Sequence, residues 1–216
     1  MILAFRNIKR NKLFSGINIL GLAVGMACSI FILLWVQHER SYDKFHKNGA
    51  NIYRMTVEIG GLKASVAVAP IAKAMRNEIP EVKNATMLGG SGGLFEYGDR
   101  RFDEKNVYLA DSTFFEVFSF ALAKGDINTA LLSPYNILIT ENVAKKYFGN
   151  EDPMGKVIKR NNSENFTVAG ILRNVPANSH LQFDILIPMS YYSRTAPDFV
   201  NNDWDNYNYY TYVQLA

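Results

Sequence analysis

The segment from Gly149 to Val157 comes closest to a nucleotide-binding motif. In a phosphate-binding loop, two glycines separated by four residues precede a lysine and a serine or threonine, and backbone N–H groups hold the phosphates. Here five residues separate Gly149 from Gly155, and Val157 stands where a hydroxyl group would bind magnesium. Glu151 and Asp152 within the segment would also repel phosphate. The segment is therefore typical of a turn, and we expect no nucleotide site.

A second glycine-rich segment, Gly89 to Gly93, could bind an anion through its backbone N–H groups. It does not have the spacing of a dinucleotide-binding loop, and no clear strand-to-helix arrangement surrounds it. We expect the residues from Leu88 to Gly93 to form a flexible loop.

The three histidines are His38, His46 and His180, and they lie far apart in the sequence without zinc-ligand spacing. No serine lies in a nucleophile-elbow sequence. His180 follows Asn178 and Ser179 in a predicted turn, where we expect a hydrogen-bonded structural side chain. The histidines and serines predict neither a metal site nor a nucleophile.

Asp203 and Asp205 flank Trp204 and could act as the paired carboxylates of a membrane-tethered hydrolase. Acidic neighbours in a loop usually point apart and stay solvated, so this hydrolase is the weakest of three functional hypotheses. We expect no catalytic residue and no cofactor.

Cys28 is the only cysteine, so neither a disulfide framework nor a cysteine-based metal site is available. A lipoprotein anchor would need an apolar segment that ends at the cysteine, but the apolar run continues to Val36. The folded part must therefore be held together by its own core.

The apolar run from Ile17 to Val36 contains 20 residues and no charge. As a helix it would be about 30 Å long, which matches the hydrocarbon thickness of a bilayer. A cleaved signal peptide has a shorter apolar region followed by small residues, whereas Trp35 and Val36 end this run. We predict a cytoplasmic basic segment over residues 1–16, a transmembrane helix over 17–36 and an exported domain over 37–216.

Four basic residues precede the apolar run, namely Arg6, Lys9, Arg10 and Lys12. The positive-inside rule then places the N-terminus in the cytoplasm. Two interpretations of this segment stay open: an amphipathic helix on an anionic membrane surface, or a charged flank that only sets topology. Apart from these four residues, basic and acidic side chains are nearly equal in number, which argues against a nucleic-acid partner.

Gly21, Gly25 and Ser29 recur every four residues and share one face of the predicted helix. Small side chains allow a second membrane helix to approach closely, although glycine is common in membrane helices in any case. We expect this face to pack against another helix.

The exported part shows short strand patterns interrupted by helical ones, which predicts an α+β fold rather than a continuous parallel sheet. Thr140 has the position of a helix N-cap and Gly149 that of a helix stop. Asp111, Ser112 and Thr113 form a second capping sequence, before an aromatic turn that we expect in the core. The predicted strands cover residues 52–59, 107–110, 136–139, 156–159, 166–172, 183–187 and 207–215, and the predicted helices 70–79, 114–118 and 141–148.

Taken together, several segments resemble the MacB-like periplasmic core domain found at the start of FtsX-type ABC transporter permeases. Each block is weak alone, but their order along nearly the whole chain is specific. The blocks are Phe5 to Lys12, Tyr42 to His46, Ile52 to Arg54, Asp111 to Phe115, Phe118 to Phe120, Thr140 to Lys156, Phe166 to Leu172, Asn178 to Asp184, Trp204 and Tyr210 to Tyr212.

This resemblance implies a domain of two small α/β subdomains that carries out no catalysis. A separate cytoplasmic ABC ATPase would supply the energy, and the permease would convert it into export or mechanical work in the periplasm. The chain would lie in the bacterial inner membrane as a homodimer or heterodimer formed through membrane helices. A periplasmic adaptor or lipoprotein could be a further partner.

Members of the family continue into three more membrane helices, whereas this sequence stops at Ala216. We therefore expect a fragment or a truncated reading frame. The alternative is a stand-alone single-pass protein whose exported domain binds a partner without transport activity.

Overall fold

The computed structural model describes residues 12–197 and 202–216. It divides into two compact units, residues 1–42 and residues 43–216. In the described part of the first unit, α2 (Lys12–Glu39) is one unbroken helix of 28 residues, none of which is buried. It is long and apolar enough to cross a membrane. The helix extends beyond the predicted residues 17–36 at both ends, because flanking polar residues also complete helical hydrogen bonds.

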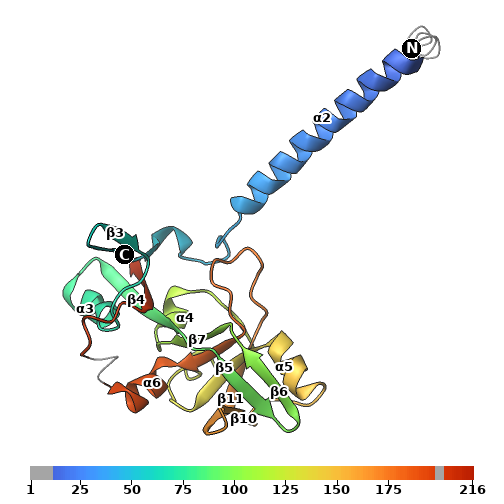
Figure 1. Ribbon diagram of the computed structural model, residues 1–216. Coiled ribbons are helices and arrows are strands. Elements are labelled where there is room, and N and C mark those ends of the chain that lie inside the picture. The colour runs from blue at the N-terminus through green and yellow to red at the C-terminus, as the bar shows by residue number, and fades with distance from the viewer. Residues whose placement is uncertain (1–11, 198–201) are drawn as a thin grey trace. The chain divides into compact units, whose positions relative to one another are not determined.

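The second unit is built from strands with short helices between them (Figure 1). The strands are β1 (Ile52–Arg54), β2 (Val57–Ile59), β3 (Leu62–Ala64), β4 (Val82–Gly90), β5 (Gly93–Tyr97), β6 (Arg100–Glu104), β7 (Val107–Ala110), β8 (Leu122–Gly125), β9 (Asn136–Thr140), β10 (Val157–Arg160), β11 (Glu164–Leu172), β12 (Ile185–Pro188) and β13 (Tyr209–Leu215). The helices are the 3-10 turn η1 (Gly49–Asn51), α3 (Ile71–Glu78), α4 (Phe114–Val117), α5 (Glu141–Phe148) and α6 (Met189–Thr195).

Among the described residues, 11 strands form one sheet in the order β1-β13-β4-β7-β12-β9-β11-β10-β5-β6, with β8 beside β11. Most neighbours are antiparallel, and the pairs β7 with β12 and β9 with β11 are parallel. This mixed sheet confirms the α+β class. Residues 43–216 form one compact unit. The division of this unit into two small subdomains stays an expectation from the resemblance.

The sheet has a hydrophobic cluster on each face, because successive side chains of a strand point to opposite sides. In β9, Ile137 and Ile139 join one cluster, whereas Leu138 joins the other. Helices α3, α5 and α6 contribute to the first cluster and α4 to the second. Phe114 and Phe118 are 0% and 1% exposed, which confirms that the aromatic turn lies in the core.

The predicted start and end of α5 are confirmed. The Thr140 hydroxyl accepts a hydrogen bond from the backbone N–H of Val143 at 3.4 Å. Gly149 ends the helix with φ +64°, a conformation that glycine adopts without steric strain.

The prediction of one continuous strand over residues 52–59 is wrong, because the structure has two strands there, β1 and β2. The chain leaves the large sheet after Arg54, and β2 pairs with β3 in a separate two-stranded sheet. Gly60 and Gly61, both with positive φ, form the turn between β2 and β3. A period-two pattern cannot show this change of partner, because side chains alternate in either sheet.

The prediction of a flexible loop over Leu88 to Gly93 is also wrong. Gly89 belongs to β4 and pairs with Tyr209 on one side and Leu109 on the other. A Cβ atom at Gly89 would lie 3.0 Å from the Tyr209 ring, so glycine lets that ring pack against the strand. The composition indicated flexibility, whereas pairing on both sides orders the segment.

Candidate functional site

The predicted packing face on α2, formed by Gly21, Gly25 and Ser29, is not buried in the structure. A Cβ atom at Gly21 or Gly25 would meet nothing within 4 Å. The Ser29 hydroxyl donates to the Gly25 carbonyl at 2.9 Å, so its polar group is satisfied inside the helix. Such a surface suits close approach of a second helix.

The predicted topology residues lie at the other end of the first unit. Lys12 is the first residue of α2 and is exposed. Arg6, Lys9 and Arg10 lie outside the described residues.

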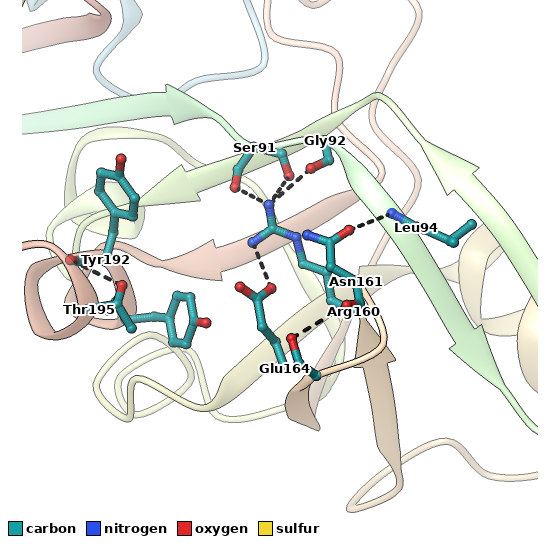
Figure 2. Close-up of polar contacts among 10 residues, drawn as sticks. Ser91, Gly92, Leu94, Arg160, Asn161, Glu164, Tyr192 and Thr195 are labelled. Atoms are coloured by element: carbon teal, nitrogen blue, oxygen red, sulfur yellow. Dashed lines mark hydrogen bonds and ion pairs between the residues drawn. The ribbon is translucent and has the colours of Figure 1, made fainter.

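The glycine-rich segment around Ser91 is held by Arg160, as Figure 2 shows. The guanidinium group donates to the carbonyl oxygens of Ser91 and Gly92 and to the Ser91 hydroxyl at 2.9–3.2 Å. The same group lies 3.3 Å from the Glu164 carboxylate. The N–H groups of Ser91 and Leu94 already donate to the Val107 carbonyl at 2.8 Å and to the Asn161 side chain at 3.1 Å, so they do not bind an anion.

The other segments that the sequence suggested as possible sites form local turns. The segment from Gly149 forms a turn in which Lys156 pairs with Glu151. The Asp203 carboxylate accepts from the backbone N–H of Asp205 at 3.0 Å, so the two acids form a turn. Within residues 12–197 and 202–216, no group of three metal-binding side chains comes together.

The structure brings Asp43 and His180 together at the start of the second unit. The His180 Nδ1 atom lies 2.8 Å from Asp43 Oδ2, and the His180 backbone N–H donates to Asp43 Oδ1 at 3.0 Å. The Ser179 hydroxyl also donates to Oδ1, at 3.3 Å, and the Asp43 backbone N–H donates to the Asn178 carbonyl at 2.9 Å. Residue 43 is therefore fastened to residues 178–180 through both its backbone and its side chain.

The contact continues from His180 into β13. Its Nε2 atom lies 2.8 Å from the hydroxyl of Tyr212, which is 3% exposed. Burial raises the pKa of Tyr212 to about 12, so its phenol stays neutral near pH 7. The Asp-His-Tyr chain thus joins three segments that are far apart in the sequence.

His46 packs beside this contact as an uncharged core residue. It is 5% exposed, and its Nδ1 atom accepts the backbone N–H of Ser119 at 3.0 Å. The rings of Phe45, Phe118 and Phe120 lie 4.0–5.1 Å from the imidazole, centre to centre. Burial lowers the pKa of His46, which favours the neutral ring.

Hydrogen bonding offsets burial at Asp43. Burial alone would raise the pKa of its carboxyl, but the bonds from the ring and backbone of His180 outweigh this effect and leave the pKa below the ordinary value of 3.8. We call the set Asp43, His46, His180 and Tyr212 the junction cluster. Arg54 lies beside it, with its guanidinium 4.5 Å from the centre of the Tyr210 ring.

Sequence reasoning did not find the junction cluster. The hydrogen-bonded structural role expected for His180 is confirmed, but its partner was not foreseen, because 137 residues separate it from Asp43. The available signal was that Tyr42 to His46 and Asn178 to Asp184 both belong to the family-like blocks.

Several solved structures resemble this chain. A domain of a putative permease protein from Porphyromonas gingivalis shares 27% identity and covers 77% of this chain and 75% of its own, with a TM-score of 0.68. The periplasmic region of MacB from Actinobacillus actinomycetemcomitans has 19% identity, coverage of 78% and 76%, and a TM-score of 0.59. The extracellular domain of the noncanonic ABC-type transporter YknZ from Gram-positive bacteria has 16% identity, coverage of 76% and 81%, and a TM-score of 0.54. The second and third likenesses support the fold alone.

Comparison with curated proteins gives no match. The sequence profile of the MacB-like periplasmic core domain, however, matches residues 15–216. That match includes both segments that meet in the junction cluster. The chain therefore belongs to the family of the MacB-like periplasmic core domain, which is a component of ABC transporter permeases.

Proposed function

We propose that this chain is the membrane anchor and periplasmic domain of an ABC permease subunit. It couples a separate cytoplasmic ATPase to export or to mechanical work in the periplasm. The observation that carries this proposal is the junction cluster, because it fastens the segment that follows α2 to the folded domain.

The position of Asp43 supports a coupling role. It follows Glu39, the last residue of α2, after three intervening residues, and four of its polar contacts go to residues 178–180. A displacement of the helix end would therefore pull on a hydrogen-bonded attachment instead of a loose linker. From there, His180 contacts Tyr212 in β13.

Strand pairing is a second way in which a displacement of the helix end would be transmitted to the domain. β1, the first strand after the membrane segment, is antiparallel to β13, with Ile52 opposite Gln214 and Arg54 opposite Tyr212. Their backbone hydrogen bonds connect the two ends of the domain directly, so both ends would move as one body.

The remaining parts of the proposal concern the membrane. The helix α2 lies in the bacterial inner membrane. By the positive-inside rule, the basic residues Arg6, Lys9, Arg10 and Lys12 keep the N-terminus on the cytoplasmic side. The Gly21, Gly25 and Ser29 face packs against a helix of a partner subunit or of a second copy. A periplasmic adaptor or lipoprotein is a further partner.

Affinity purification of the full chain from its native membranes tests the ATPase partner. We expect an ABC ATPase to co-purify. If none does, a stand-alone binding module becomes the better interpretation.

Hydrogen exchange in the purified complex then tests coupling. Adding ATP should change the exchange of residues 43–54 and 178–182, and Asp43→Asn should abolish this change while ATP hydrolysis continues. Asp103→Asn, an exposed change of the same chemistry, is the matched control. Coupling through this cluster is refuted if Asp43→Asn responds as the wild type does.

Topology needs a separate test with single cysteines in a Cys28→Ser background. A maleimide that cannot cross the inner membrane should modify Asn150→Cys in cells with a permeabilised outer membrane. It should modify Asn7→Cys only after lysis, and the reverse pattern would overturn the orientation.

A further inference from the structure

A cavity of about 550 Å³ lies between α3, β4 and the start of α6. Its volume is within the range of small-molecule sites, which is roughly 300–1,000 Å³. The lining combines apolar side chains with a few polar ones, as such sites usually do. The junction cluster contributes no residue to this cavity.

The cavity lies where two parallel strands end. β7 and β12 are adjacent, with Ala110 opposite Pro188. The next residues along the chain, Asp111 and Met189, both line the cavity. The carboxyl ends of parallel strands are a common place for ligands, because the loops that follow them diverge and leave a crevice.

Two cations on α3 face this space. Lys73 and Arg76 are three residues apart and therefore share one side of the helix. Within residues 12–197 and 202–216, neither has an ion-pair partner.

The acid in the lining does not neutralise these cations. The Asp111 carboxylate accepts four hydrogen bonds inside the protein, from the Thr86 hydroxyl at 2.6 Å, the Met87 N–H at 3.3 Å, and the N–H and hydroxyl of Thr113 at 3.1 and 2.7 Å. Burial raises the pKa of Asp111, and even in its ionised form Asp111 supplies one negative charge against the two positive charges of Lys73 and Arg76. The lining residues that the structure describes therefore carry net positive charge.

One polar atom of the lining lacks a partner. The Ser190 hydroxyl oxygen is buried and has no hydrogen bond in the described part of the chain. Apolar side chains complete the wall: Met87, Leu131 and Met189 are 3–6% exposed, and Leu132 at the rim is 60% exposed. Positive charge, an unpaired hydroxyl and an apolar wall occur together in this cavity.

We propose that this cavity binds a small amphipathic anion, whose charged group lies near Lys73 and Arg76 and whose apolar part contacts Met87 and Met189. This inference does not depend on the proposed coupling role. It assigns the domain a ligand site in addition to its mechanical attachment.

Residues 43–216 are suitable for the test, because they form one compact unit with their own core and the matching regions of relatives were crystallised as isolated domains. The probes are octanoate, 1-octanol and octylammonium, which share an apolar chain and differ in charge. Titration followed by amide chemical shifts should show octanoate binding at least tenfold more tightly than the other two. The shifts should centre on α3, Asp111 and Ser190.

The double variant Lys73→Gln, Arg76→Gln should lose the preference for octanoate and keep the affinity for octanol. The double variant Lys63→Gln, Lys83→Gln removes two exposed lysines outside the cavity and should bind as the wild type does. Thermal melting confirms that both variants are folded. Equal affinity for the three probes, no binding of any of them, or an unchanged preference in the first variant would overturn the proposal.

Discussion

Asp43 and His180 are 137 residues apart in the chain, and each oxygen of the Asp43 carboxylate contacts a different part of His180. Oδ2 meets the ring and Oδ1 meets the backbone N–H. Asp43 has φ +57°, a region that aspartate and asparagine tolerate better than most residues. Aspartate therefore suits position 43 in two ways: it tolerates the positive φ, and its two oxygens bind His180.

Replacing Asp43 with asparagine should destabilise residues 43–216 by roughly 1–3 kcal/mol, because an uncharged amide accepts weaker hydrogen bonds than a carboxylate does. Asparagine keeps the tolerance of positive φ, so backbone strain does not confuse the result. Urea denaturation measures the free energy of unfolding. The control Asp103→Asn should stay within about 0.5 kcal/mol of the wild type, and an equal loss in both variants would contradict a special role of Asp43.

The free energy of unfolding should fall as the pH is lowered, in two steps. Folding lowers the pKa of His46 from its ordinary value of 6.5, so the folded state favours the neutral ring. Stability is then complete above pH 6.5 and declines as the pH falls toward the lower folded pKa. Folding also lowers the pKa of Asp43 from 3.8, so its contribution is lost as the pH falls through that lower value.

The His46→Asn variant isolates the first step. The amide oxygen can accept the Ser119 N–H in place of Nδ1, but asparagine does not titrate. Denaturation at several pH values should show a flatter dependence below pH 6.5 than in the wild type. The comparison with the wild type cancels other titrating groups such as Asp111, and an unchanged slope would show that His46 is not the cause.

Gly125→Ala should destabilise the domain by roughly 2–4 kcal/mol. Gly125 has φ +99°, and a Cβ atom there would lie 2.6 Å from the Ala169 carbonyl oxygen, which is backbone and cannot rotate away. Gly90→Ala is the matched control, because a Cβ atom at Gly90 meets nothing within 4 Å. Thermal melting of both variants should show a loss for Gly125→Ala alone.

Gly25→Leu should weaken association through α2 by roughly threefold to thirtyfold, because a large side chain prevents close helix approach. Gly16→Leu is the control, since nine residues place Gly16 on the opposite side of the helix from Gly25. Co-purification of the membrane partner, or of a differently tagged second copy, measures the effect. Equal binding by both variants would show that this face is not the contact.

The sequence by itself determined the elements that depend on neighbouring residues. The uncharged run from Ile17 to Val36 requires a long apolar helix. Thr140 and Gly149 define the ends of α5 through a side-chain cap and a positive φ, both of which are local interactions. The order of the family-like blocks also predicted the family that the sequence profile shows.

Only the tertiary structure decided which distant segments meet. Leu88 to Gly93 is ordered because β13 and β7 pair with it, and the strands' own residues carry no signal of that pairing. The sequence placed Asp43 in the block from Tyr42 to His46 and His180 in a predicted turn, and only the fold shows that the two are in contact. The physical reason is that hydrogen bonds and burial depend on distance in space, whereas sequence patterns report only the preferences of residues that are close along the chain.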